Sequence, residues 1–269
     1  MDKEEYKKGV EATFDAVAQR YDKNRFFAIS AANMAGLVPL AESLRILDLS
    51  TGTGAVALEV AGKHPSAQIH AIDLSQGMLE IAKSKAREKG LTNIEFRQCD
   101  VDTIAYDSHT FDIVTCGYGL FFYPDMEATY QAICKTIKPG GRFLFSSFTE
   151  QAFNPYAELF LKRLEHEYGV EPPSRLRERL NSKGQIKALA ATAQFNTIDV
   201  IHEPIRYPIS IIEWWYLLNG AGFKSLLDQL DNKRLERFKK DHLAEIQGLS
   251  GATTIELNAD SLYTVVTFN

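Results

Sequence analysis

The residues best suited to chemistry form a short turn of small side chains, Asp48-Leu49-Ser50-Thr51-Gly52-Thr53-Gly54. Glycine adopts positive φ readily, so such a turn lets the backbone approach a ligand closely. A helix N-terminus after the turn would offer unpaired N–H groups to an anion or a carboxylate. Asp73 follows about 19 residues after Gly54, where a carboxylate can accept hydrogen bonds from both hydroxyls of a ribose. This spacing predicts a site for a ligand that contains a nucleoside.

The same turn also fits a second kind of ligand. Residues 52–57, Gly-Thr-Gly-Ala-Val-Ala, satisfy the Gly-x-Gly-x-x-Ala form of a dinucleotide-binding turn, so a nicotinamide-dependent oxidoreductase is an alternative. Asp48 argues against it, because a carboxylate there would repel a pyrophosphate and would suit a ligand with an ammonium and a sulfonium group. Asp100, after a third apolar run, is placed to accept from an adenine amino group. Both carboxylates favour an adenosine ligand that carries positive charge.

Short apolar runs alternate regularly with amphipathic segments, and the elements that this pattern predicts would position these residues. The pattern predicts a doubly wound α/β domain with a parallel sheet, because strands separated by helices form βαβ units. Ser75 is a candidate N-cap for a helix whose apolar face includes Met78, and Gly90 ends that helix. Cys116 ends the fourth strand near the ligand crevice. The predicted strands are 45–49, 68–72, 94–98, 111–116 and, after a tight break at Lys138-Pro139-Gly140-Gly141, 142–148.

The remaining segments predict a cover, a lid and the end of the sheet. Residues 5–21 have the spacing of an amphipathic helix, with Tyr6, Val10, Phe14, Val17 and Tyr21 on one face. We expect further helices at 155–168, 184–193, 214–230 and 235–247, a Pro- and Arg-rich connection at 171–179, and strands at 198–201 and 262–268. The predicted organisation is a helical cover at 1–30, a ligand-binding core at 31–150, helical lid insertions at 151–181 and 209–258, and remaining core at 182–208 and 259–269.

Composition narrows the classes of function. The 269 residues include 30 basic and 35 acidic side chains, and a net charge of −5 gives no electrostatic footprint for nucleic acid or an anionic membrane. No apolar run approaches the ~20 residues of a membrane helix. Three scattered cysteines predict free thiols in a reducing compartment, and the N-terminus lacks the apolar run of a signal peptide. Six histidines show no metal-ligand spacing. We expect a cytoplasmic protein without a bound metal.

The combined motifs resemble those of the class I S-adenosylmethionine (SAM) dependent methyltransferases, in particular the ubiquinone/menaquinone-biosynthesis C-methyltransferase group. The likeness covers residues 14–148 well and the rest loosely. The segments that carry it are Ile46 to Gly54, His70 to Leu79, Phe111 to Val114 and Lys138 to Gly141. Residues 14–22 resemble the N-terminal cover of the family, which places Tyr21 over the cofactor. The family implies a Rossmann-like, mostly parallel, seven-stranded sheet whose last strand is antiparallel.

The resemblance also implies how SAM would be held. Gly52 and Gly54 would face its methionine part, and Asp48 would lie near its amino group. Asp73 would hold the ribose, Leu74 and Val101 would enclose the adenine, and Asp100 would accept from the adenine amino group. Met78 and Cys116 complete the predicted cofactor residues. Ser50 departs from the family, which has glycine there, and serine disfavours positive φ.

The acceptor of the methyl group is predicted by class only. The loop at 117–123 lies where the family binds its substrate, and Tyr118 is the candidate for substrate orientation or proton transfer. This loop lacks the Asn/Asp-Pro-Pro-Tyr/Phe pattern of many nucleic-acid methyltransferases, which favours a small-molecule substrate. The density of aromatic residues, among them Phe121, Phe122 and Phe148, would fit an aromatic or apolar one. Besides the oxidoreductase, an enzyme of this fold that binds SAM and catalyses another reaction, such as cyclisation, stays open. The oligomeric state is not predicted.

Overall fold

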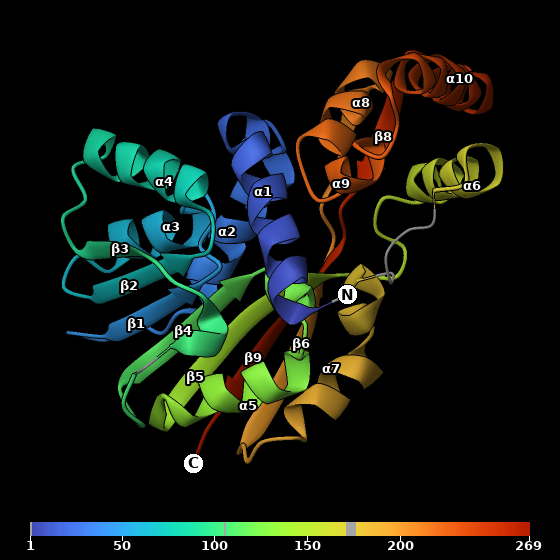
Figure 1. The fold of residues 1–269 in the computed structure, drawn as a ribbon. Helices are drawn as coiled ribbons and strands as arrows, with labels where there is room; N and C mark the ends of the chain where they lie inside the picture. Colours follow the sequence, from blue (N-terminus) through green and yellow to red (C-terminus); the bar gives the residue numbers. More distant parts are fainter. Residues whose placement is uncertain (1, 105, 171–175) are drawn as a thin grey trace.

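A seven-stranded sheet forms the centre of the computed structural model, which describes residues 2–104, 106–170 and 176–269 (Figure 1). Its order is β3-β2-β1-β4-β5-β9-β6. The strands are β1 (Arg45–Leu49), β2 (Gln68–Asp73), β3 (Ile94–Gln98), β4 (Phe111–Gly117), β5 (Ile137–Phe148), β6 (Thr197–Glu203) and β9 (Ser261–Thr267). β1 to β5 pair in parallel, and β9 lies antiparallel between β5 and β6. The predicted sheet, including its antiparallel last strand, is confirmed.

Helices cover both faces of this sheet. On one face lie α2 (Arg25–Leu37), α3 (Ala55–Lys63) and α4 (Gln76–Glu88), and on the other α5 (Met126–Lys135) and α7 (Lys183–Ala190) (Figure 1). Successive strand residues point to opposite faces. Ile46 accordingly packs among residues of α2 and α3, whereas Leu47 packs in the cluster that includes Tyr130 of α5. Because both faces are buried, the strands have the near-continuous apolar sequence of a parallel sheet.

Local capping residues set several helix ends as predicted. The hydroxyl of Ser75 accepts from the backbone N–H of Met78 at the start of α4, and Gly90 has a φ of 67° just after its end. At 138–141, however, the predicted break before a strand is instead part of β5. The register of β5 against β4 shifts between Phe111 and Ile113, so the Pro-Gly-Gly segment is a bulge within a longer strand.

The insertions form a helical layer beyond the carboxyl ends of the strands. It contains α6 (Tyr156–Tyr168), η3 (Leu176–Leu180), α8 (Ile211–Asn219), α9 (Lys224–Leu227) and α10 (Asn232–Ser250). Trp214 is buried there, and its indole N–H donates to Nε2 of His242 at 3.0 Å. The helix predicted over 214–230 is two helices, because the chain turns at Gly220 and Gly222. Residues 171–175 of the predicted connection lie outside the described residues.

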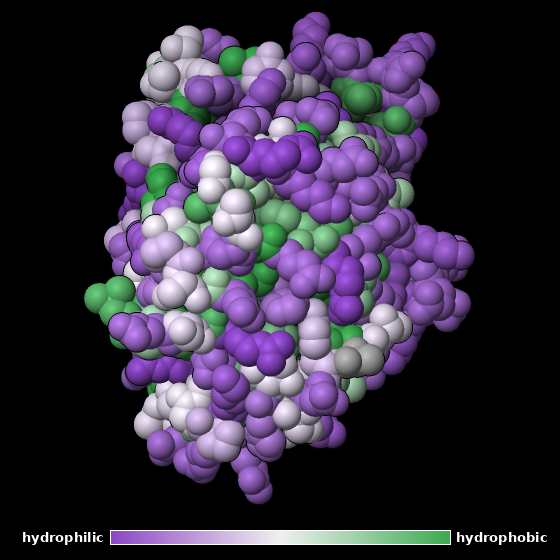
Figure 2. Space-filling view, turned by 90° about the vertical axis from the view of Figure 1, so that its left-hand side faces the viewer, coloured by the Kyte–Doolittle hydropathy of each residue, from purple (hydrophilic) through white to green (hydrophobic). Residues whose placement is uncertain are grey.

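Of the α-helices and strands in the described part of the chain, three had no sequence prediction. They are α2, β7 (Arg206–Ser210) and β8 (Thr254–Asn258), and the last two form a separate antiparallel pair under the helical layer. α1 (Lys3–Tyr21) crosses the carboxyl ends of the strands (Figure 1). The face on the side of β1 to β3 is mainly hydrophilic, with small separate apolar areas (Figure 2). Among the described helices, none is long and apolar enough to cross a membrane.

Candidate active site

Two neighbouring cavities lie where the strands end and α1 crosses them. The first, called here the strand-end cavity, is lined by the residues that follow β1, β2, β3 and β4 and by one side of α1. The second, called the aromatic cavity, lies between α1, α2 and the helical layer and measures about 430 Å³. Residues that line both cavities are Tyr6, Val10, Phe14, Tyr21, Tyr118 and Phe122. The two cavities therefore share a wall, most of which is one face of α1.

The turn after β1 forms the floor of the strand-end cavity. Ser50 has a φ of 49° and Gly52 a φ of 55°, so the position at which the family has glycine keeps the left-handed backbone here. The Ser50 hydroxyl hydrogen-bonds the Tyr123 hydroxyl at 2.9 Å, which offsets part of the cost of that conformation. Gly119 makes room for this serine, because a Cβ at position 119 would lie 2.7 Å from the Ser50 Cβ.

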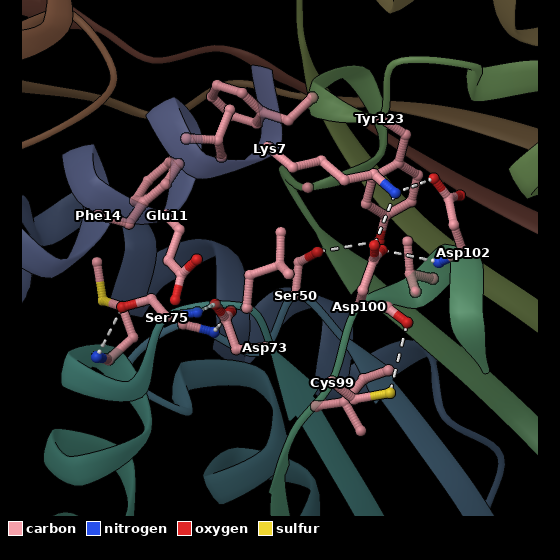
Figure 3. A pocket seen from close by; sticks show the side chains of 18 of the residues that line it. Lys7, Glu11, Phe14, Ser50, Asp73, Ser75, Cys99, Asp100, Asp102 and Tyr123 are labelled. Atoms are coloured by element: carbon pink, nitrogen blue, oxygen red, sulfur yellow. Dashed lines mark hydrogen bonds and ion pairs between the residues drawn. The ribbon is translucent and has the colours of Figure 1, made fainter. Parts of the chain in front are cut away.

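Asp73, at the end of β2, lies against that turn. One carboxylate oxygen accepts from the backbone N–H of Gly52 at 2.7 Å, and the other accepts from the N–H of Ser75 at 2.9 Å (Figure 3). Burial raises the pKa of Asp73 to about 6, and the nearby charge of Asp15 adds to the increase, against the lowering effect of the two N–H groups. Oxygens held in this way keep lone pairs that can accept from a ligand.

Asp48 lies beneath the turn and not in the wall of the strand-end cavity. Its side chain accepts from the hydroxyls of Thr51 and Thr115, both at 2.6 Å, and the residue is 1% exposed. Burial raises its pKa to about 6. The structure places Asp48 under the turn, which it fixes from below through these two hydrogen bonds. Its predicted position near the amino group of a ligand stays a prediction.

Two other predicted cofactor residues also lie behind the cavity wall. Gly54, with a φ of 80°, packs against α4, since a Cβ there would lie 3.0 Å from the Ala82 Cβ. Cys116 is fully buried, and burial raises the pKa of its thiol to about 12, which leaves it a neutral core residue. The predicted residues that do line the strand-end cavity are Tyr21, Ser50, Gly52, Asp73, Leu74, Met78, Asp100, Val101 and Tyr118.

Asp100, at the end of β3, forms an ion pair that the sequence did not suggest. The Lys7 ammonium of α1 lies 2.6 Å from Asp100 and 2.7 Å from Asp102 (Figure 3). Burial lowers the pKa of Lys7, but the hydrogen bonds to both carboxylates outweigh burial and raise it. Asp100 also accepts from the backbone N–H of Asp102 at 2.9 Å, which fixes its orientation. The i, i+4 spacing of charged residues from Lys3 onward was the signal that could have identified Lys7.

The charges that line the strand-end cavity are mostly negative. Four carboxylates, those of Glu11, Asp73, Asp100 and Asp102, face one ammonium group, that of Lys7. Such a lining attracts a cationic ligand and repels a pyrophosphate. This electrostatic arrangement supports the interpretation of the turn as a site for SAM and not for a dinucleotide. Among the described residues, no group of histidine, cysteine and acidic side chains could hold a metal ion.

Tyr118 is part of the wall between the two cavities, but its hydroxyl points elsewhere. Its ring stacks on Phe148, with 4.2 Å between the centroids, and its hydroxyl lies 2.6 Å from the hydroxyl of Ser261, which lines neither cavity. Burial raises the pKa of Tyr118, so it stays protonated at neutral pH. The structure therefore places the Tyr118 ring in the wall, and its predicted role in substrate orientation or proton transfer stays a prediction.

Aromatic side chains from distant parts of the chain line the aromatic cavity. They are Tyr6, Phe14, Tyr21, Phe26, Phe27, Tyr118, Phe121, Phe122, Phe148, Phe153 and Phe223. Its size lies within the range of about 300–1,000 Å³ found for small-molecule sites, and its lining suits a flat or apolar ligand. Trp214 and Trp215 lie outside both cavity walls, in the core of the helical layer.

Comparison with known proteins gives a consistent result. A family model described as a methyltransferase domain matches residues 40–194. A ubiquinone/menaquinone biosynthesis C-methyltransferase of Desulfotalea psychrophila is 31% identical over 80% of this chain and 82% of its own length. An aklanonic acid methyltransferase of Streptomyces is 30% identical over 68% of this chain and 87% of its own. The YcgJ protein of Bacillus subtilis shares the fold, with a TM-score of 0.59, 20% identity, and coverage of 90% of this chain and 98% of that one.

Proposed function

Because the chain belongs to the class I SAM-dependent methyltransferases, we propose that it transfers the methyl group of SAM to a small apolar or aromatic acceptor. The observation that carries this proposal is the position of the aromatic cavity, which shares a wall with the strand-end cavity. An acceptor in the aromatic cavity would meet a cofactor in the strand-end cavity at that wall. The relatives named above support a small-molecule acceptor.

The strand-end cavity offers groups that match each part of the cofactor. Asp73 would accept from the ribose hydroxyls and Asp100 from the adenine amino group, while Leu74 and Val101 would contact the adenine ring. Gly52, at which an added Cβ would meet no atom within 4 Å, leaves room for the methionine part. When bound, SAM supplies an electrophilic methyl group on a sulfonium. The negative lining fits the positive charges of that molecule.

Catalysis in this proposal depends on position and on the exclusion of water. Among the described residues, the wall shared by the two cavities contains no carboxylate, histidine, lysine or cysteine, and its Tyr118 stays protonated. The carboxylates of the aromatic cavity, those of Glu5, Glu178 and Asp228, lie outside this shared wall. The wall of Tyr118, Phe148 and Phe122 would hold the acceptor in line with the methyl group, and correct alignment can lower a barrier by as much as about 7–11 kcal/mol. We therefore propose an acceptor that is itself nucleophilic or readily loses its proton.

The thiols agree with the predicted location in the reducing cytoplasm. Cys99, Cys116 and Cys134 are free, and the last two are buried. We propose that the protein acts there on a diffusible molecule, with no role for nucleic acid. Cell fractionation would test the location, and recovery of the native protein with oxidised cysteines outside the cytoplasm would contradict it.

The experiment that tests this function uses SAM labelled in its methyl group. Purified protein is incubated with labelled SAM and a desalted cell extract to which its small-molecule fraction has been returned. We expect label in a product that partitions into organic solvent, and no such product with the Asp73→Ala variant. Label found in RNA or protein would overturn the acceptor class, and tight binding of NAD without binding of SAM would overturn the cofactor.

A further inference from the structure

α1 presents two stripes of side chains to the rest of the molecule. The polar stripe is Lys3, Lys7, Glu11 and Asp15, spaced four residues apart, so these residues lie on one face of the helix. The apolar stripe is Tyr6, Val10, Phe14 and Tyr21, and all four line both cavities. One helix therefore borders the cofactor and also forms a wall of the proposed acceptor site.

Each residue of the polar stripe contacts a strand end or the segment that follows one. Lys3 pairs with Asp125 at 3.0 Å, and Glu11 accepts from the Gln98 side chain at 3.3 Å. Asp15 accepts from the Ser75 hydroxyl at 2.5 Å and from the Gly77 N–H at 2.9 Å. These contacts hold α1 across the opening of the strand-end cavity along most of its length.

Lys7 makes the most enclosed of these contacts. Its side chain is 11% exposed, compared with 61% for Lys3, and it bridges two carboxylates. A less exposed ion pair is screened less by solvent and contributes more. Asp102 is itself fixed by the Thr129 hydroxyl of α5 at 2.6 Å, so the bridge joins α1 to a rigid part of the core. Asp100, the other partner, is the proposed acceptor of the adenine amino group.

We propose that Lys7 couples the two binding sites by holding α1 closed when the adenine is bound at Asp100. The inference rests on the proposed function. A cofactor in the strand-end cavity would contact the strand ends and also α1, through Val10 and Phe14, so its binding would favour the closed position of α1. When the adenine takes a lone pair of Asp100, the Lys7–Asp102 pair keeps the helix in place, and the apolar stripe is then fixed against the substrate. Cofactor binding should therefore raise acceptor affinity, and linkage requires that the acceptor raise cofactor affinity by the same factor. Lys7 acts as a positioning residue, since it works through α1.

Two ligands of known identity make this coupling measurable. S-adenosylhomocysteine, the demethylated product of SAM, reports on the strand-end cavity by calorimetry. Nile red, a neutral dye that fluoresces in apolar surroundings, reports on the aromatic cavity. Dye affinity is measured with and without saturating S-adenosylhomocysteine in wild type, Lys7→Met, Lys7→Arg and Lys8→Met. Lys8 is the matched control, because it is the exposed neighbour of Lys7 on the same helix.

In the wild type we expect S-adenosylhomocysteine to tighten dye binding at least about fivefold, the lower end of usual coupling. The Lys7→Met variant should reduce this factor to less than about twofold, whereas Lys7→Arg and Lys8→Met should keep it. A coupling factor that is absent in the wild type, or unchanged in Lys7→Met, would overturn the inference.

A second variant covers the case in which Lys7→Met does not fold. Asp102→Asn removes the other end of the bridge and leaves Asp100 in place, so it should lower the coupling factor in the same way. Retention of full coupling in Asp102→Asn would contradict the proposal. Failure of every variant and of the wild type to bind S-adenosylhomocysteine would instead contradict the proposed function, which keeps the two ideas separable.

Discussion

The two cavities are built in different ways although they share a wall. In the strand-end cavity, the decisive groups are carboxylates that directly follow β2 and β3, held by backbone N–H groups within two residues or by the neighbouring turn. In the aromatic cavity, the lining comes from α1, α2, the loop after β4, β5, α6, η3, α8 and α9 and from the segments between them. The carboxylates of the first cavity are thus positioned by the strands that they follow, with α1 closing one side, whereas the second cavity depends on how the insertions pack over the sheet.

This difference separates the tasks of the enzyme. In the proposed function, directional hydrogen bonds to fixed carboxylates would recognise one cofactor, and such recognition is lost when a hydrogen-bond partner is removed. Apolar contact is not directional, and the free energy that it contributes scales with the buried area. The aromatic cavity could therefore bind different methyl acceptors if its lining changed. Under the proposed function, changes in the insertions would alter which substrate is methylated, while the strand ends would keep the same cofactor.

The largest expected effect is on the strand-end cavity alone. Asp73→Ala removes the acceptor for two ribose hydroxyls, and charge-assisted hydrogen bonds contribute about 1.5–3 kcal/mol each. We expect S-adenosylhomocysteine affinity in calorimetry to fall at least about a hundredfold. Nile red affinity should change by less than about twofold, since Asp73 does not line the aromatic cavity. An equal loss of affinity for both ligands would show that a change in one cavity also alters binding in the other.

The converse change should affect only the aromatic cavity. Ala221 lines that cavity and not the strand-end cavity, so Ala221→Phe would fill part of the acceptor space. We expect Nile red affinity to fall about tenfold or more, with S-adenosylhomocysteine affinity unchanged in calorimetry. Undiminished dye binding in a folded variant would show that the acceptor space lies elsewhere.

A pH titration should also distinguish the cavities. With its pKa raised to about 6, Asp73 is ionised at pH 7.5 and mostly protonated at pH 5. The ionised form is the one that accepts from both ribose hydroxyls, so S-adenosylhomocysteine affinity should fall about tenfold as the pH is lowered from 7.5 to 5. Nile red affinity should stay constant in the same series. An S-adenosylhomocysteine affinity that is flat across this range would contradict the role given to Asp73.

The smallest expected effect is at Ser50, which stands in the turn after β1 where the family has glycine. Ser50→Gly relieves a left-handed conformation that costs serine about 1–2 kcal/mol, and it loses the hydrogen bond to Tyr123, which contributes about 0.5–1.5 kcal/mol. We expect the free energy of unfolding in urea to change by less than about 1 kcal/mol. S-adenosylhomocysteine affinity should stay within about threefold. A tenfold change would show that the serine hydroxyl contacts the cofactor directly.

Much of the core could be predicted from the sequence because its signals are local. Each strand before β5 was placed to within a residue, since a buried parallel strand requires a continuous apolar run followed by a turn. Ser75 and Gly90 marked the ends of α4 through their own backbone preferences. The positions of Asp73 and Asp100 at neighbouring strand ends followed from the same pattern, because the carboxyl ends of parallel strands meet at one edge.

What the sequence did not determine depends on contacts between distant segments. Asp48 and Gly54 belong to the motif, yet only packing decided that they would contact Thr115 and Ala82. The hydroxyl of Tyr118 found Ser261, 143 residues away, and Lys7 found a carboxylate 93 residues away. Spacing in the chain fixes which residues share a strand end or a helix face. Which faces meet is decided by tertiary packing, because the free energy gained by burial depends on the apolar area that is buried and not on the separation of the residues in the sequence.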